Sequence, residues 1–201
     1  MKLYHHPHTR SFRPLWLLEE LQVPYELIDI DIFHGEGRTE SYRQINPYGK
    51  VPTLDDDGTV IYEAGAICLY LADKFVEKNL APALNTPERG LYYQWMFFAP
   101  GTMEPPLMNI FLHSKLLPEE ERIPILVEQG VKQFNKIADN LNQTIEKKPY
   151  LLGDQFSTAD IMVSSTLQWF PDFLDDRPEL KAYVNRNSER PAYQRAQEHN
   201  Q

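Results

Sequence analysis

The spacing of apolar residues changes several times along roughly the first 75 positions. Short strand-like runs begin at Lys2 and Tyr25, and two more flank Asp57-Gly58, a dipeptide typical of hairpin turns. Between the first two runs, apolar residues fall on one helical stripe: Phe12, Leu15, Trp16, Leu18 and Leu21. With a short helix over 39–45 and another after Glu63, the predicted order is βαβαββα. Connections of this length predict one parallel strand pair extended by an antiparallel hairpin.

The segment from Asn46 to Glu63 contains several local signals. Asn46-Pro47 ends the preceding helix, because a residue before proline avoids helical dihedrals. Pro52 cannot donate a ladder hydrogen bond and therefore marks the entry to the strand at Thr53. Glu63 stands where the next helix begins, beside free backbone N–H groups and the positive end of the helix dipole. We expect this position to hold a small anion.

The second part of the chain has helical spacing and turn signals, with no convincing strand. Residues 76–87 read as a linker, and Pro105-Pro106 predicts a kink or break in the helices that follow. Further helices are expected over 119–146 and 178–197. Ser157-Thr158-Ala159-Asp160 matches a capping box that opens an almost uniformly apolar helix. The expected domains are residues 1–77 and 86–201.

Composition and charge exclude several classes of function. The 201 residues include 20 basic and 29 acidic ones, for a net charge of −9, which argues against nucleic acid or an anionic membrane as the main partner. The single cysteine excludes an internal disulfide and a CxxC redox pair. No apolar run has the length of a membrane span, and Met1-Lys2 leads directly into a strand. A cytoplasmic protein is the simplest interpretation.

Three groups of side chains admit a functional and a structural interpretation. His5, His6 and His8 suggest a metal site, but no matching cysteine or second histidine pair accompanies them, so a solvated loop is favoured and no metal is expected. Cys68 lies in an apolar helical run and is expected to pack as a small hydrophobe. A stripe in the helical part is expected to be core: Trp95, Phe98, Met103, Met108 and Phe111.

Four motifs together resemble the cytosolic glutathione S-transferases, and the likeness is greatest to the bacterial members. They are MKLY…TRSFRPLWLLEEL, NPYGKVPTL, YEAGAICLYLADKF and FSTADIMV, which cover nearly the full length. The resemblance implies an α+β fold with an N-terminal thioredoxin-like βαβαββα domain followed by an all-α domain. It also implies a homodimer that uses glutathione as co-substrate.

The resemblance assigns glutathione to the segments around Pro52 and Glu63. It implies a cis peptide bond before Pro52 and pairing of the Val51 backbone with the cysteinyl part of glutathione, like an added strand. Glu63 and Ala64 would hold the γ-glutamyl end, and Lys50 would lie near the polar backbone of the peptide. Many members carry serine where this chain has Ala64, so a hydroxyl contact of about 1 kcal/mol is absent.

The thiol-activating position is expected at Thr9 or Ser11, in that order, with Arg10 as an electrostatic contributor. The thiolate is the nucleophile, and a hydroxyl that donates to sulfur stabilises it. The alternative is that Thr9 or Ser11 only caps the helix.

The predicted function is conjugation of glutathione to hydrophobic electrophiles. Two alternatives stay open: glutathione-dependent reduction of peroxides or disulfides, and a non-catalytic interaction module that uses the same fold.

Overall fold

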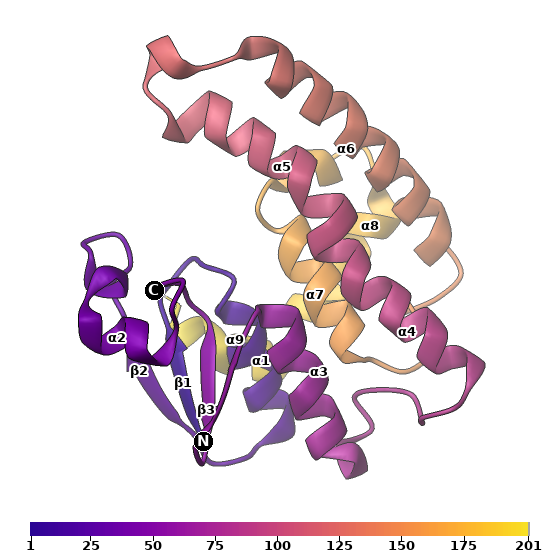
Figure 1. Ribbon diagram of the computed structural model, residues 1–201. Helices are drawn as coiled ribbons and strands as arrows, with labels where there is room; N and C mark the ends of the chain where they lie inside the picture. Colours follow the sequence, from indigo (N-terminus) through magenta and orange to yellow (C-terminus); the bar gives the residue numbers. More distant parts are fainter. Residues whose placement is uncertain (201) are drawn as a thin grey trace. The chain divides into compact units, whose positions relative to one another are not determined.

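The computed structural model describes residues 1–200 and divides into two compact units (Figure 1). The first unit contains Met1–Ala81 together with the C-terminal segment from Ser188, and the second contains Pro82–Asn187. No helix in the described part of the chain is long and apolar enough to cross a membrane.

A mixed four-stranded sheet and three helices from the N-terminal part form the first unit. The strands are β1 (Lys2–His5), β2 (Glu26–Asp29), β3 (Thr53–Asp56) and β4 (Thr59–Tyr62), and the helices are α1 (Phe12–Leu21), α2 (Glu40–Ile45) and α3 (Ala64–Lys74). The spatial order is β2-β1-β3-β4, with β1 parallel to β2 and antiparallel to β3. This confirms the predicted βαβαββα order and the parallel pair with its antiparallel hairpin.

The strand register brings four chain segments to one end of the sheet. His5, the last residue of β1, lies opposite Asp29, the last residue of β2. Thr53, the first residue of β3, lies opposite both Tyr4 and Tyr62. The same end of the sheet therefore carries the loops after β1, β2 and β4 and the segment before β3.

A C-terminal helix, α9 (Pro191–Glu198), packs on α1 within the first unit. The Tyr193 ring meets the rings of Trp16 and Phe12 edge-to-face, with centroids 4.9 and 5.4 Å away. The Arg190 guanidinium donates to both carboxylate oxygens of Glu20 at 2.6 and 2.8 Å.

The single helix predicted over 178–197 is wrong. The segment forms α8 (Pro178–Ser188) and α9, and Arg190 between them is extended because it precedes Pro191. The predicted helical range 86–201 consequently includes a segment that belongs to the first unit.

The second unit is helical. Its main helices are α4 (Pro87–Phe98), α5 (Glu104–Phe111), α6 (Pro124–Ile145), α7 (Thr158–Leu167) and α8. The break expected at Pro105-Pro106 takes another form: both prolines fit the first turn of α5, and a π-helical turn, Ala99–Met103, joins α4 to α5. The helix expected over 119–146 begins only at Pro124.

Helix α7 is buried along its whole length, as expected for the centre of a helical domain. Its predicted capping box is confirmed: the Ser157 N–H and hydroxyl each donate to Asp160 at 2.9 Å. Asp160 also accepts from Leu151 N–H and the Tyr183 hydroxyl, both at 2.9 Å.

The aromatic and methionine stripe expected to be core is only partly so. Met103 is fully buried, Trp95, Phe98 and Met108 are half-buried, and Phe111 is 36% exposed.

Candidate active site

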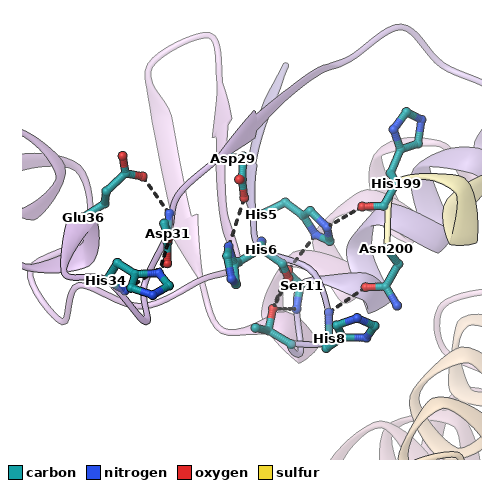
Figure 2. Close-up of polar contacts among 11 residues, drawn as sticks. His5, His6, His8, Ser11, Asp29, Asp31, His34, Glu36, His199 and Asn200 are labelled. Atoms are coloured by element: carbon teal, nitrogen blue, oxygen red, sulfur yellow. Dashed lines mark hydrogen bonds and ion pairs between the residues drawn. The ribbon is translucent and has the colours of Figure 1, made fainter.

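The loop that follows β1 contains the two candidate hydroxyls, on Thr9 and Ser11. Ser11 precedes α1 in helical dihedrals, and its side chain makes no cap hydrogen bond, so the capping alternative is wrong for this residue. Its hydroxyl oxygen instead lies 2.7 Å from His5 Nδ1 and accepts from the His6 N–H at 3.1 Å (Figure 2). Ser11 is fully buried.

Thr9 is half-buried and closes the loop before α1. Its hydroxyl donates to the His6 carbonyl at 2.7 Å and accepts from the Ser11 N–H at 3.2 Å. The Thr9 carbonyl also accepts from the Phe12 N–H at 3.2 Å. The Thr9 side chain thus closes a turn before the helix instead of capping a helix N–H, and Thr9 is the less buried of the two candidate residues. Arg10 lies between the two, half-buried in the same loop.

The three histidines have different surroundings. His5 is wrongly predicted as a solvated loop residue: it ends β1 and is 2% exposed. Burial lowers the pKa of its imidazole, and a contact with the His199 carbonyl opposes that shift. The His6 ring pairs with Asp29 at 3.1 Å, whereas the His8 side chain is exposed. Residues 1–200 hold no group of three or more His, Cys, Asp or Glu side chains placed for a metal ion.

Just before Pro52, the backbone N–H and C=O groups of Val51 are without backbone partners in residues 1–200. The Val51-Pro52 peptide bond is cis, and Val51 packs on Tyr4 and Tyr42. The preceding carbonyl, of Lys50, accepts from the Tyr42 hydroxyl at 2.7 Å and from Asn46 Nδ2 at 2.9 Å.

Glu63 occupies a strained conformation at the start of α3. Its φ of 76° and ψ of 117° lie where a residue with a side chain is rarely found. Its carbonyl accepts from the Ile67 N–H at 3.0 Å, and the first N–H groups of α3 have no partner within the helix. Ala64 is buried and Glu63 is exposed, so an exposed carboxylate stands beside an unpaired helix start.

Cys68 lies outside this constellation. It is fully buried in α3, and burial raises its pKa to about 12. The thiol is therefore protonated and inaccessible, which confirms the predicted packing role and removes it as a nucleophile.

The predicted site residues thus come from three segments of the first unit that share one end of the sheet. Thr9, Arg10 and Ser11 follow β1, Lys50, Val51 and Pro52 precede β3, and Glu63 and Ala64 follow β4. Together they present a loop with two hydroxyls, a backbone segment with unpaired groups at Val51 and a helix N-terminus.

Comparison with known proteins identifies the family. The glutathione S-transferase N-terminal domain model matches residues 1–73, and the C-terminal domain model matches residues 103–191. This chain belongs to the glutathione S-transferase family.

Solved and curated relatives of the transferase agree with this assignment. A structure described as a ternary complex of BphK, a bacterial transferase, is 31% identical, with a TM-score of 0.89 over 100% of this chain and 99% of that one. A sphingomonad glutathione S-transferase complexed with glutathione is 25% identical, with a TM-score of 0.87 over 100% and 98%. The disulfide-bond oxidoreductase YfcG of Escherichia coli is 28% identical over 90% of this chain and 84% of its own length.

Several supporting residues of the transferase were missed from sequence. Asn46 and Tyr42 donate hydrogen bonds to the Lys50 carbonyl. In the sequence, the Asn46-Pro47 dipeptide predicts only the end of a helix and does not indicate these contacts. His199 and Asn200 reach the loop after β1: the His199 carbonyl meets the His5 ring and Asn200 accepts from the His8 N–H at 2.8 Å. The C-terminal sequence does not indicate these contacts.

We expect Asn46→Asp to lower the free energy of unfolding by about 1–3 kcal/mol. Asn46 is 1% exposed, and its Nδ2 donates to the Lys50 carbonyl and, at 2.9 Å, to Thr53 Oγ1. A carboxylate cannot donate to that carbonyl and would place a buried charge against it. Denaturant unfolding measures the change.

Asn140→Asp, at an exposed position on α6, is the matched control and should change stability by no more than about 0.5 kcal/mol. Equal stability of the two variants would show that the Asn46 contacts do not hold the segment.

Proposed function

We propose that this transferase binds glutathione along one end of its sheet and conjugates the thiolate to hydrophobic electrophiles. The observation that carries the proposal is the convergence of the Thr9 hydroxyl, the open Val51 backbone and the start of α3 at that end. The family and the glutathione complex of the sphingomonad relative support the choice of ligand.

Each segment has groups that suit one part of glutathione. The unpaired Val51 N–H and C=O suit an extended peptide added as a strand. Glu63 supplies a carboxylate for the γ-glutamyl ammonium, while the free N–H groups of α3 suit the adjoining carboxylate. Exposed Lys50 would lie near the polar backbone of the peptide.

Thr9 is the better candidate for stabilising the thiolate. Thr9 is only half-buried, whereas Ser11 is completely buried. A donated hydrogen bond that depresses the thiol pKa by about 2 units corresponds to about 2.7 kcal/mol. Arg10, in the same loop, would add a favourable positive charge.

Disulfide reduction is the second candidate, because YfcG carries that name. The buried, protonated Cys68 cannot exchange with a disulfide, so bound glutathione would have to supply every reactive thiol.

We expect Thr9→Val to lower kcat/KM for conjugation to a chlorodinitrobenzene-type electrophile by about 100-fold, because the thiolate loses its hydrogen bond. Thr9→Ser keeps a hydroxyl and should retain activity within about fivefold of wild type. Steady-state kinetics measures both variants, and calorimetry measures glutathione affinity. An unchanged rate for Thr9→Val would contradict the assignment.

The same preparations distinguish the alternatives. Turnover of a small disulfide or peroxide without conjugation would favour the reductase. Failure of the wild type to bind glutathione would favour the interaction module.

We expect Ala64→Ser to tighten glutathione binding by about fivefold, which corresponds to about 1 kcal/mol for one added hydroxyl contact. Ala66→Ser lies in the same first turn at an exposed position and serves as the control. If calorimetry gives Ala64→Ser the wild-type dissociation constant, serine at this position does not contact glutathione.

We further propose that the chain forms a homodimer in the cytoplasm. Tyr93 and Phe97 lie four residues apart on α4 and are 38% and 66% exposed, which leaves an aromatic strip for a second copy. We expect Phe97→Glu to give monomers in sedimentation velocity while the wild type sediments as a dimer. A wild-type monomer at micromolar concentration would refute the assembly. The cytoplasmic location stays a prediction.

A further inference from the structure

Three polar groups form a continuous chain from Thr9 to the buried His5 ring. Thr9 Oγ1 lies 2.7 Å from Ser11 Oγ, and Ser11 Oγ lies 2.7 Å from His5 Nδ1. Figure 2 shows the Ser11 and His5 contacts together with the link from His5 to the C-terminal turn. These hydrogen bonds therefore lead from Thr9, which is half-buried, to His5, which is 2% exposed.

The His199 carbonyl determines which ring nitrogen of His5 carries the proton. His5 Nε2 lies 3.3 Å from that oxygen, which can only accept, so Nε2 is the donor. In a neutral ring Nδ1 is then an acceptor. It lies 2.7 Å from the Ser11 hydroxyl, nearer than the His6 carbonyl at 3.0 Å, so we assign the Ser11 proton to Nδ1. The Ser11 oxygen is left with lone pairs that can accept from Thr9. The hydrogen bonds can thus all run in one direction, from Thr9 through Ser11 to His5.

We propose that His5 accepts the proton of the glutathione thiol through the hydroxyls of Thr9 and Ser11. This inference rests on the proposed function. The S–H bond breaks as its proton joins Thr9 Oγ1, while the Thr9 proton moves to Ser11 Oγ and the Ser11 proton moves to His5 Nδ1. Both hydroxyls are restored, and the products are a thiolate and an imidazolium. After these transfers the hydrogen bonds run from His5 to Thr9, and the Thr9 O–H points at sulfur, where it stabilises the thiolate.

Without a thiol, the Thr9 hydroxyl has a second partner. It also lies 2.7 Å from the His6 carbonyl, and one proton cannot serve both that oxygen and Ser11. Glutathione would select the orientation toward Ser11, since sulfur then supplies the proton that Thr9 passes on.

The surroundings of His5 suit a group that begins neutral and becomes charged. Burial lowers its pKa, which keeps the resting ring neutral and able to accept. Asp29, opposite it on β2, favours the charged ring, whereas His6 opposes it. His199, on the C-terminal side, contributes its backbone carbonyl. A thiolate would add a further negative charge, so the ring and the sulfur would titrate as a coupled pair.

The test replaces His5 by asparagine, whose amide can still hydrogen-bond Ser11 but cannot take up a proton. Glutathione is added at neutral pH, thiolate is followed by its ultraviolet absorbance, and proton release is measured by calorimetry in two buffers of different ionisation enthalpy. In the wild type we expect thiolate to form without a matching release of protons. In His5→Asn we expect about one proton per thiolate, and the acid limb of kcat/KM should move up by about one pH unit.

Two further variants separate a proton path from a structural role. Ser11→Ala interrupts the chain and should reproduce both changes, and adding His5→Asn to it should have no further effect. His34→Asn makes the same substitution at an exposed histidine paired with Asp31 and should match the wild type.

A His5→Asn protein that binds glutathione and keeps the wild-type proton release and pH profile would overturn the relay and leave the transferase function standing. If that variant does not fold, Ser11→Ala gives the same readouts. Absence of glutathione binding by the wild type would instead refute the proposed function on which the relay depends.

Discussion

The antiparallel pairing of β1 with β3 is the constraint on which the site depends. It places Thr53 opposite Tyr4, so the residues before Thr53 and those after His5 emerge at one end of the sheet. A shift by one residue would turn the side chains of β3 to the opposite face and would move Leu54 out of the core, where it is fully buried. The alignment of the Val51 backbone with the Thr9 loop is thus fixed by packing that has no part in the chemistry.

The C-terminal segment supports the same end of the sheet from a distant part of the sequence. Arg190 and Arg195 pair with Glu20 and Glu19 on α1, and the turn after α9 then reaches the loop after β1 through His199 and Asn200. The arginines of these pairs are partly exposed, and the buried Tyr193 ring, which meets Phe12 and Trp16 edge-to-face, gives the helix an apolar anchor. A carbonyl held in this way can select a histidine tautomer.

Local signals in the sequence predict most of the architecture, whereas most segments of the candidate site come from the family resemblance. The apolar periodicity of α1, the Asp57-Gly58 turn and the Ser157 capping box each depend on residues close together in the chain, and each signal has a counterpart in the structure. Predictions failed where a long-range contact decided the outcome. The sequence predicts a solvated loop at His5 because it does not reveal that β1 extends to this residue or that a carbonyl 194 residues later contacts its ring. The two-helix C-terminus was missed although Pro191 carries a local signal for it.

The hydrogen-bond partners of Thr9 and Ser11 distinguish these two hydroxyls more clearly than their exposure does. A hydroxyl has one proton, and Ser11 is surrounded by an imidazole nitrogen, a carbonyl and a second hydroxyl that can each receive it. With Nε2 of His5 engaged as a donor, the strongest acceptor for that proton is Nδ1, so Ser11 has none to offer to sulfur. In the proposed relay, the Thr9 proton points at sulfur once the protonated His5 ring donates to Ser11 and Ser11 donates to Thr9. In that relay the residue that contacts the thiol and the residue that accepts its proton are different, and the burial of Ser11 and His5 separates the two roles.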